Sequence, residues 1–452
     1  MAITTDDTIV AISSGQGRSG IGVVRLSGPG CSDICFEVTG IRPKHRQVCF
    51  SHFKDEEGIF IDSGIVLFFE GPHSFTGEDV LELQAHGNPI ILRELVSLSV
   101  QIGARQARPG EFTERAFRNG KLSLDQAEAV ADLIASQTRR ATISAARTLT
   151  GVFSAKVDEI LDSIRQSLYQ IEATIDFEEE VDFNRLTTVL RTAATRQIGI
   201  LSKLISKTEI GIRLKEGFYI VILGPPNVGK STLLNQLASS DMAIVSDIPG
   251  TTRDPVKAAI DIAGIPVHVV DTAGIHDTPD LLEVTGIERT KSEAQKADII
   301  LYLSDEHFVS TEELEREVRQ LGSNIKADII LVRNKVDLLN IDAGIVALGN
   351  KKVVNLSAKK GLGIDLLFAT IIDSLTPAEG HEDEFVARER HLNALRKTSN
   401  ILASIDFNIF ESSPELVAEE YRLACRELEV LAGKYTTEEM LGDIFSRFCI
   451  GK

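Results

Sequence analysis

The sequence lacks the features of a membrane-spanning or exported chain. Its apolar runs fall well short of the roughly 20 residues needed to cross a bilayer. The first residues, Met1–Asp7, include neither a basic nor an apolar segment of the secretory type. The five cysteines are odd in number and mostly far apart, which argues against a disulfide framework and for a reducing compartment. We therefore expect a cytoplasmic protein with no membrane partner.

Net positive charge is also missing. The formal net charge of −18 disfavours a general polyanion binder, although a local patch can still attract such a partner. One segment runs against this trend, because basic residues outnumber acidic ones between positions 105 and 121. We interpret it as a solvated helical face, with an RNA-facing patch as the alternative. Its basic residues are Arg105, Arg108, Arg115, Arg118 and Lys121.

Size and composition are those of an ordinary globular protein with several domains. A chain of 452 residues, 43% hydrophobic and 25% charged, is long enough for about two to four separate cores. Residues 1–118 have the short apolar segments of a compact α+β domain. The expected elements are strands at Thr8–Ile12, Ile21–Leu26, Gly64–Phe69 and Asp79–Gln84, and a helix at Pro89–Val100.

The remaining sequence predicts a helical domain that is interrupted by an α/β domain. Residues 119–215 and 378–452 are helical in pattern, and an apolar stripe over Val157–Ile175 indicates a long amphipathic helix of a helical bundle. Residues 216–377 alternate apolar strands with helices, as in a doubly wound parallel sheet. The predicted strands are Tyr219–Leu223, Val267–Val270, Ile299–Leu303, Ile329–Val332 and Val353–Leu356.

A phosphate-binding motif opens the α/β segment. Residues Gly224 to Ser231 have the sequence GPPNVGKS, which fits G-x-x-x-x-G-K-[ST] and lies between a predicted strand and a predicted helix. In such a loop, backbone N–H groups at a helix N-terminus converge on phosphates. We expect Lys230 to reach the β- and γ-phosphate oxygens and Ser231 to ligate Mg²⁺.

Further motifs complete a nucleotide site of the GTPase type. The run Asp271-Thr272-Ala273-Gly274 ends a predicted strand, where a carboxylate can reach Mg²⁺ through water and an N–H can meet the γ-phosphate. Thr252, in Thr251-Thr252-Arg253-Asp254, is the expected switch residue that adds its hydroxyl to the Mg²⁺ shell.

The predicted base is guanine. Asn334-Lys335-Val336-Asp337 follows another strand, and the Asp337 carboxylate can accept hydrogen bonds from both guanine N1–H and the exocyclic amine. Adenine lacks this pair of donors and would leave the carboxylate unpaired. The run Ser357-Ala358-Lys359 can place a backbone amide on guanine O6.

One GTPase element is absent. Ile275 occupies the position where a glutamine usually positions the attacking water, and an aliphatic side chain cannot replace it. Positive charge at the transition state, worth roughly 10³–10⁵ in rate, must also be supplied. Two sources remain open: Arg253, or a monovalent cation held by the amide oxygen of Asn227. The candidates for positioning the water are His276 and Glu283.

Together these motifs resemble the MnmE (TrmE) family of tRNA-uridine modification GTPases, over essentially the whole chain. The resemblance also rests on Thr8–Ala11, Ile21–Gly28, Ser74–Leu83, Arg108–Phe117, Asn119–Leu122 and the ending Phe448–Lys452. It implies an N-terminal domain that dimerises and binds 5-formyl- or methylene-tetrahydrofolate, and an inserted Ras-like P-loop GTPase. It further implies a homodimer that acts with the flavoprotein MnmG, as a heterotetramer, on the wobble uridine of certain tRNAs. The product would carry an aminomethyl or carboxymethylaminomethyl group at C5.

The resemblance also implies roles for particular residues. Folate would contact Arg25, Glu82, Lys121 and Lys452, and Glu283 would be catalytic. Potassium, in place of an arginine finger, would bind Asn227, Ser246, Ile248 and Thr251, and Mg²⁺ would bind Ser231 and Thr252. The expected GTP contacts are Asn227, Val228, Gly229, Lys230, Ser231, Thr232, Ser246, Asp247, Ile248, Pro249, Gly250, Thr251, Thr252, Asp271, Thr272, Ala273, Gly274, Asn334, Lys335, Asp337, Ser357, Ala358 and Lys359.

Three cysteines and two other function classes remain to be considered. Cys449 is either a reactive thiol or a small buried hydrophobe. Cys31 and Cys35 lie one helical turn apart without further zinc ligands, which disfavours a metal site. The chain could instead be a switch module, such as a ribosome-assembly GTPase, or a folate enzyme in which GTP is only regulatory.

Overall fold

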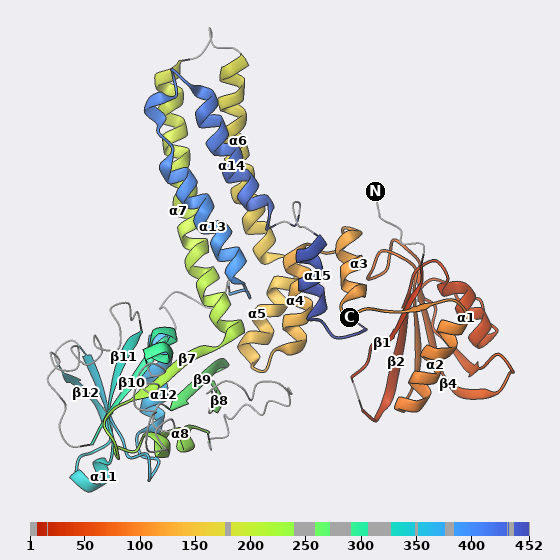
Figure 1. Cartoon of the computed structure of the whole chain (residues 1–452), viewed down its shortest axis with the longest axis horizontal. Coiled ribbons are helices and arrows are strands. Elements are labelled where there is room, and N and C mark those ends of the chain that lie inside the picture. Colours follow the sequence, from red (N-terminus) through yellow and green to blue (C-terminus); the bar gives the residue numbers. More distant parts are fainter. Residues whose placement is uncertain are drawn as a thin grey trace, which may run out of the picture. The chain divides into compact units, whose positions relative to one another are not determined.

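The computed structural model of the chain divides into two compact units (Figure 1). Unit 1 comprises Met1–Ala135, Ala145–Ile205 and Arg390–Lys452, and unit 2 comprises Ser136–Ser144 and Ser206–Glu389. The structure describes residues 7–15, 17–176, 182–238, 258–271, 291–305, 327–348, 351–375, 384–431, 433 and 438–451. None of the helices in these ranges is long and apolar enough to cross a membrane.

Unit 1 begins with a six-stranded sheet in the order β3-β4-β5-β2-β1-β6. Its neighbours pair antiparallel except β1 and β6, which are parallel. Helices α1 (Cys31–Thr39) and α2 (Pro89–Gln101) bury their apolar sides in the same core as the sheet. The strands are β1 (Ile9–Ile12), β2 (Ser19–Ser27), β3 (Cys49–Lys54), β4 (Phe60–Phe69), β5 (Val80–Gly87) and β6 (Arg105–Gln106).

The four strands and the helix predicted in this region are confirmed, with bounds that differ by a few residues. Two strands and one helix were missed. Strand β3 contains His52 and Lys54 among its apolar residues, and it lies at the edge of the sheet, where polar side chains face water. Helix α1 ends at Gly40, whose φ of 72° is the left-handed conformation that closes many helices.

Helices form the rest of unit 1, and its bundle is built by α6, α7, α13 and α14, which run side by side (Figure 1). The predicted apolar stripe is confirmed on α6: Ile160, Ile164 and Ile171 are each at most 2% exposed, and α6 packs on α14. Gln197 on α7 donates to the Ser163 carbonyl of α6 at 3.0 Å, so α7 lies on another side of α6. The helices are α3 (Glu111–Arg118), α4 (Leu124–Ala135), α5 (Arg139–Leu149), α6 (Val152–Asp176), α7 (Phe183–Glu216), α13 (Glu389–Ser404), η5 (Phe407–Ile409), α14 (Pro414–Glu429) and α15 (Glu438–Ser446).

Unit 2 contains a seven-stranded sheet in the order β12-β13-β11-β10-β7-β9-β8. The five central strands are parallel, and β8 and β12 pair antiparallel at the two edges. The predicted doubly wound sheet is therefore present, and its five predicted strands are the central ones. The bounds are β7 (Phe218–Leu223), β8 (Ala258–Ile262), β9 (Ile265–Asp271), β10 (Ile299–Ser304), β11 (Asp328–Arg333), β12 (Gly344–Leu348) and β13 (Lys351–Asn355).

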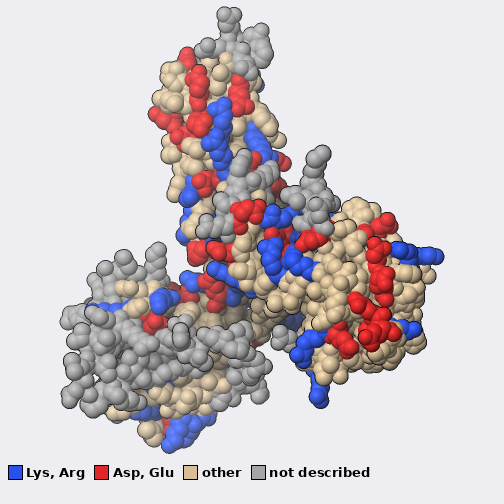
Figure 2. All heavy atoms as spheres, turned by 45° about the vertical axis from the view of Figure 1, so that its right-hand side comes forward, with Lys and Arg blue, Asp and Glu red and all other residues tan. Residues whose placement is uncertain are grey.

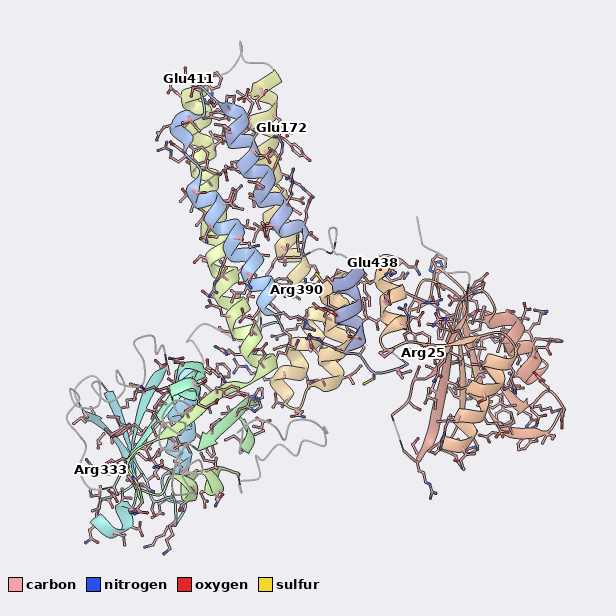
Figure 3. All side chains as sticks on the ribbon, in the orientation of Figure 1. Arg25, Glu172, Arg333, Arg390, Glu411 and Glu438 are labelled. Carbon is pink, nitrogen blue, oxygen red and sulfur yellow. The ribbon has the colours of Figure 1, made fainter. Side chains whose placement is uncertain are left out.

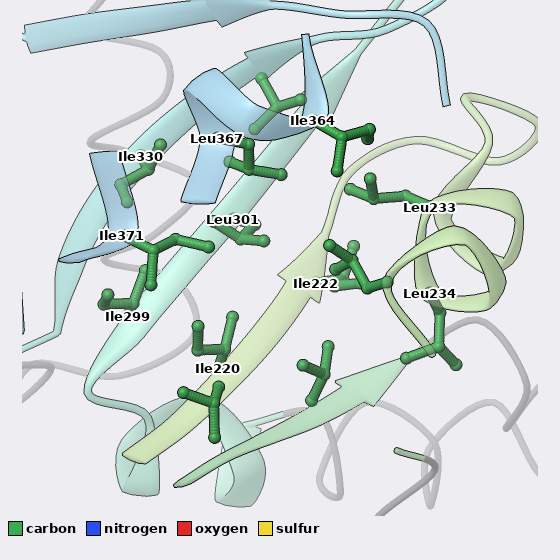
Figure 4. Close-up of a cluster of buried hydrophobic side chains, with 14 of the residues drawn as sticks. Ile220, Ile222, Leu233, Leu234, Ile299, Leu301, Ile330, Ile364, Leu367 and Ile371 are labelled. Atoms are coloured by element: carbon green, nitrogen blue, oxygen red, sulfur yellow. The ribbon is translucent and has the colours of Figure 1, made fainter. Parts of the chain in front are cut away.

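Both faces of this sheet are buried, which explains why its strands are continuously apolar. Ile220 and Ile222 of β7 join a cluster with helices α8 (Lys230–Ala238) and α12 (Ile364–Leu375) (Figure 4). Val221 and Leu223 of the same strand point to a second cluster on the opposite face. A short helix, α11 (Val336–Leu339), follows β11.

The basic segment 105–121 is only partly the expected solvated helical face: Arg115 on α3 is buried, whereas Arg105 and Arg108 precede α3 and are exposed but paired with carboxylates. Arg115 is 4% exposed and lies 2.8 Å from Asp7 and 2.9 Å from Glu78. Arg105 and Glu111 approach to 2.6 Å, and Glu111 is only 2% exposed. Burial alone would raise the pKa of Glu111, but hydrogen bonds from Arg105 and the Arg108 amide, together with their charges, lower it to about 2. These arginines hold the start of α3 against β1 and β6.

Candidate functional site

The phosphate-binding motif forms a loop between strand β7 and helix α8, as predicted. Gly224 has a φ of 143°, and a Cβ there would lie 2.2 Å from the Leu303 carbonyl oxygen. Gly229 has a φ of 98°, and a Cβ there would lie 2.4 Å from Nδ2 of Asn334. Side chains are therefore excluded at both positions, and the loop backbone reaches the start of α8 with its N–H groups available to an anion.

Lys230, the first residue of α8, turns back over this loop. Its Nζ donates to the carbonyls of Gly224 and Pro225, both at 2.8 Å, and the residue is 8% exposed. The ammonium group is thus fixed next to the loop that would receive phosphates, where its charge can act on them. Ser231 and Thr232 follow on the exposed first turn of α8, and Val228 is buried.

Asn334 connects three segments of the candidate site. It is 2% exposed, its Nδ2 donates to the Val228 carbonyl at 2.8 Å, and its Oδ1 accepts from the Ala358 amide at 2.9 Å. The loops that follow β7, β11 and β13 are joined in this way. The sequence predicted both loops as nucleotide contacts, and the structure brings them together through one buried amide.

Lys335 makes a second connection to the phosphate-binding loop. Its Nζ donates to the Asn227 carbonyl at 2.7 Å and lies 2.9 Å from Oδ2 of Asp305. Asn227 has a φ of 64°, in the left-handed region, and its side chain is exposed. The side-chain amide of Asn227 makes no hydrogen bond to any residue in the described ranges.

Asp337 is held in the ionised form that recognition of guanine requires. The hydroxyl of Ser357 is the main cause of its lowered pKa, and the Lys360 side chain, at 3.4 Å, adds to the effect. The Asp337 side chain is only about 10% exposed and lies close to the buried Ser357. Lys359 is exposed at the same turn.

Several predicted site residues lie outside the described residues. Strand β9 places the backbone of Asp271 opposite Ile222, but the structure does not describe the Asp271 side chain. The predicted switch, catalytic and C-terminal residues beyond the described ranges are Ser246, Asp247, Ile248, Pro249, Gly250, Thr251, Thr252, Arg253, Thr272, Ala273, Gly274, Ile275, His276, Glu283 and Lys452.

Two of the predicted folate contacts face each other on the sheet of unit 1. Arg25 on β2 and Glu82 on β5 are cross-strand partners, and the guanidinium donates to Glu82 Oε1 at 2.8 Å and 3.1 Å (Figure 3). The guanidinium lies 5.9 Å from the centre of the Phe75 ring. Lys121 packs against Gly77 of the same loop and donates to the Pro72 carbonyl at 2.9 Å.

The C-terminal segment lies against the same sheet. Ser13, just after β1, donates its hydroxyl to the Gly451 carbonyl at 3.0 Å, and Ile450 pairs with Pro109. Cys449 is exposed, so it is not a buried hydrophobe. Cys31 and Cys35 are buried, and burial raises the pKa of both thiols. No group of three or more metal-binding side chains occurs within the described ranges.

Four contacts of the candidate sites were missed by sequence reasoning. Phe75 lies within Ser74–Leu83, one of the segments that carry the family resemblance, but no role was given to it. Asp305 closely follows the predicted strand Ile299–Leu303, and an acidic residue after a strand is common in any protein. No feature of the sequence indicated that Lys360 or the Pro72 carbonyl would contact a site residue. A signal for Asp305 could have been its place directly after a predicted strand of the sheet, where loop residues gather around a ligand.

Two family models match the chain. The model for the MnmE helical domain matches residues 124–449, and that for the N-terminus of the GTP-binding protein TrmE matches residues 8–121.

Relatives of known function match over the full length. A tRNA modification GTPase MnmE from Azoarcus sp. is 45% identical over 448 residues, which cover 99% of this chain and 98% of that protein. One from Methylococcus capsulatus is 42% identical over 455 residues, which cover all of both chains. Among solved structures, a variant of Aquifex aeolicus Era bound to GDP·AlF4⁻ is 28% identical, covering 42% of this chain and 67% of its own, with a TM-score of 0.26. From its two family models and its full-length relatives, the chain belongs to the MnmE (TrmE) family of tRNA modification GTPases.

Proposed function

We propose that this tRNA modification GTPase hydrolyses GTP with a potassium ion in place of an arginine finger. The observation that carries this proposal is the geometry of Asn227. Its backbone is left-handed and its carbonyl is held by Lys335, while its side-chain amide makes no hydrogen bond within the described residues. A neutral amide oxygen beside the phosphate loop is a suitable ligand for a monovalent cation. Ser246, Ile248 and Thr251 would supply the other oxygens.

Magnesium and the attacking water would be held by further residues of the GTPase. Ser231, on the first turn of α8, and Thr252 carry hydroxyl groups of the kind that Mg²⁺ binds. When bound, Mg²⁺ and K⁺ supply positive charge to the phosphates. Glu283 would position the water, the role that Ile275 cannot perform. The base pocket would hold GTP or GDP through Asn334, Asp337 and the Ser357–Lys359 turn.

We infer a folate site in residues 1–118. Glu82 can accept N–H donors of a pterin ring, Phe75 is 39% exposed and offers an apolar surface, and Lys121 can attract a carboxylate. Arg25 is fixed between Glu82 and Phe75, and Lys452 would contribute from the C-terminus. Bound 5-formyl- or methylene-tetrahydrofolate would supply a one-carbon unit.

The proposed reaction adds an aminomethyl or carboxymethylaminomethyl group at C5 of the wobble uridine. It would need the flavoprotein MnmG and a homodimer of this chain, in the cytoplasm. We further infer the domain divisions 1–118, 119–215, 216–377 and 378–452, with the GTPase inserted between the two helical parts.

Two measurements test this proposal against its alternatives. Titration with 5-formyltetrahydrofolate should show saturable binding that Arg25→Ala weakens, whereas a pure switch module should show none. Nucleoside analysis of tRNA after deletion of the gene should show loss of the C5 group at the wobble uridine. Restoration of that group by a variant unable to hydrolyse GTP would instead make GTP regulatory.

A further inference from the structure

Two helices of the bundle in unit 1 are acidic, and their arginines are paired. Arg422 on α14 lies 3.0 Å from Glu172 of α6 and 3.3 Å from Glu419 (Figure 3). Arg165 on α6 pairs with Glu429 of α14. In the face shown by Figure 2, blue and red side chains accordingly intermingle over these helices. The arginines of α6 and α14 are therefore balanced within the bundle.

The other two helices have the opposite character. From Phe183 to Thr208, α7 contains no aspartate or glutamate, and α13 contains none after Glu389. In a chain with a net charge of −18, such a face is unusual. The four basic residues of α7 in this stretch that are exposed are Arg185, Arg191, Arg196 and Lys203.

The side chains of three of these residues are not engaged with the rest of unit 1. Arg185, Arg196 and Lys203 form no ion pair and no side-chain hydrogen bond with any residue that the structure describes. Arg191 differs, because it lies 6.0 Å from the centre of the Phe407 ring and donates to Asn408 at 3.3 Å. Arg185, Arg196 and Lys203 thus remain available to a partner. Arg191 borders a shallow hollow of about 270 Å³ between α7 and the end of α13.

Helix geometry aligns these three cations in one row. An α-helix repeats after about 18 residues, or five turns, so Arg185 and Lys203 lie on the same side of α7, about 27 Å apart. Arg196 lies between them and departs from the row by about 20°. The buried residues of α7, among them Leu190, Ala194 and Leu201, lie on the opposite side.

Short side chains separate the cations. The hydroxyls of Thr188, Thr192 and Thr195 donate to carbonyls four residues earlier, at 3.0, 2.8 and 2.9 Å. They therefore lie close to the helix backbone, and the longer basic side chains extend beyond them. A long row of cations separated by short polar side chains suits an extended polyanion.

The surface is poorly suited to a protein partner. Protein interfaces have an apolar or aromatic centre with few charges, whereas Val189 is the one large hydrophobic residue of α7 that is exposed, among those the structure describes. Exposed apolar residues occur instead on α6 and α14, at Tyr169, Leu416 and Leu423. Phosphate contacts to nucleic acids come mainly from arginine and lysine.

We propose that the α7–α13 face, with Arg185, Arg196 and Lys203 as its row of cations, binds the phosphate backbone of tRNA. This inference rests on the proposed function, in which tRNA is the substrate. The other basic segment, residues 105–121, is less suited to this role, because its arginines are paired with Asp7, Glu78, Glu111 and Glu114.

The test compares two double variants of the full-length protein that remove equal charge from the same bundle. Arg196→Gln with Lys203→Gln removes two cations of the row, and Arg422→Gln with Arg426→Gln removes two cations from α14. Binding of an unmodified tRNA transcript is measured over a range of salt concentrations, with the flavoprotein partner present. The row variant should bind about tenfold more weakly at low salt, and its slope of log affinity against log salt should fall by about 2. The α14 variant should stay within about twofold of wild type, and GTP turnover without tRNA should not change in either.

The possible outcomes separate this surface from the proposed function. If wild-type protein fails to bind tRNA at all, the proposed function is wrong. If wild type binds and both double variants bind equally well, tRNA uses another surface and the present inference is overturned. If the row variant keeps tRNA but loses the flavoprotein, the α7–α13 face is a protein interface instead.

Discussion

At the scale of single residues, the candidate nucleotide site is held together by polar side chains that each contact two other segments. The Asn334 side chain donates to Val228 and accepts from Ala358, and leaving such a buried amide without partners would cost about 1–3 kcal/mol. Lys335 similarly holds the Asn227 carbonyl while its charge is balanced by Asp305. The loops are therefore positioned before any nucleotide arrives, which reduces the ordering cost of binding.

Asp337→Asn should reduce the preference for GTP over ATP about tenfold or more. The introduced amide places N–H donors opposite the guanine donors, which removes two hydrogen bonds worth about 1–3 kcal/mol. Competition of ATP and GTP for the purified protein, followed with a fluorescent GTP analogue, measures the ratio. Asp365→Asn, on the exposed first turn of α12, is the matched control. Unchanged selectivity in Asp337→Asn would place the base elsewhere.

Glu111→Gln should destabilise unit 1 near neutral pH by about 3 kcal/mol and remove part of its acid dependence. The folded-state pKa of Glu111, about 2, lies below the ordinary glutamate pKa of 4.5. The carboxylate therefore adds stability above about pH 4.5, and this stability is lost as the pH falls toward 2. Urea unfolding followed by circular dichroism between pH 3 and 7 measures the difference. Glu94→Gln, exposed on α2, should have no such effect, and equal behaviour of the two variants would refute the role of Glu111.

At the scale of elements, the C-terminal segment is bound to the first strand by backbone contacts that leave no room for a side chain. A Cβ at Gly451 would lie 2.2 Å from the Ile12 carbonyl oxygen, and its φ of 93° is disfavoured for other residues. Gly110, where α3 begins, is equally confined by Phe445 and Phe448. The ends of α3, α15 and β1 are thus fixed to one another within unit 1.

Gly451→Ala should detach this segment from β1. Hydrogen exchange of residues 447–451 should become faster than in wild type, and the affinity for 5-formyltetrahydrofolate should fall if Lys452 contributes to that site. Gly442→Ala is the control, because a Cβ at this helical position meets no atom within 4 Å. Slow exchange retained in Gly451→Ala would show that the segment tolerates a side chain and is held by other contacts.

At the scale of the whole molecule, the chain leaves unit 1 briefly at Ser136–Ser144, leaves it again within α7 and returns at the start of α13. The segment by which the chain returns to unit 1 is anchored by one ion pair in each unit. Glu384 pairs with Arg140 inside unit 2, and Arg390 pairs with the buried Glu128 inside unit 1 (Figure 3). The segment 385–389 is therefore bordered by one ion pair in each unit.

Replacing KCl by NaCl at equal ionic strength should lower the GTP turnover of the whole enzyme at least tenfold. The smaller ion would not satisfy the same set of oxygens around Asn227, and the charge normally supplied by an arginine is worth about 10³–10⁵ in rate. Phosphate release at saturating GTP measures the effect, and GTP affinity in both salts is the control. Equal turnover would assign the positive charge to Arg253 or to a partner.

Much of unit 2 could be predicted from the sequence because its signals are local. Strand β7 is apolar throughout, and the Gly-rich loop and α8 follow it directly, so neighbours in sequence are also neighbours in the site. The edge strand β12 could not be predicted, because Val346 and Ile345 are half exposed and show no buried face. Strand β8 was missed although Ile260 and Ile262 are buried, because it is only five residues long. Their pairing is decided by the central strands.

The sequence by itself determined the order of the motifs, the choice of guanine and the apolar stripe of α6, since each depends on residue type at fixed spacing. Only the tertiary structure decided that Arg115 is buried and that Asn334 joins two loops 24 and 106 residues away. It also decided that Arg185, Arg196 and Lys203 have no side-chain partner among the described residues. The reason is physical: the energy of a charge depends on what surrounds it, and the groups around these side chains come from distant parts of the chain.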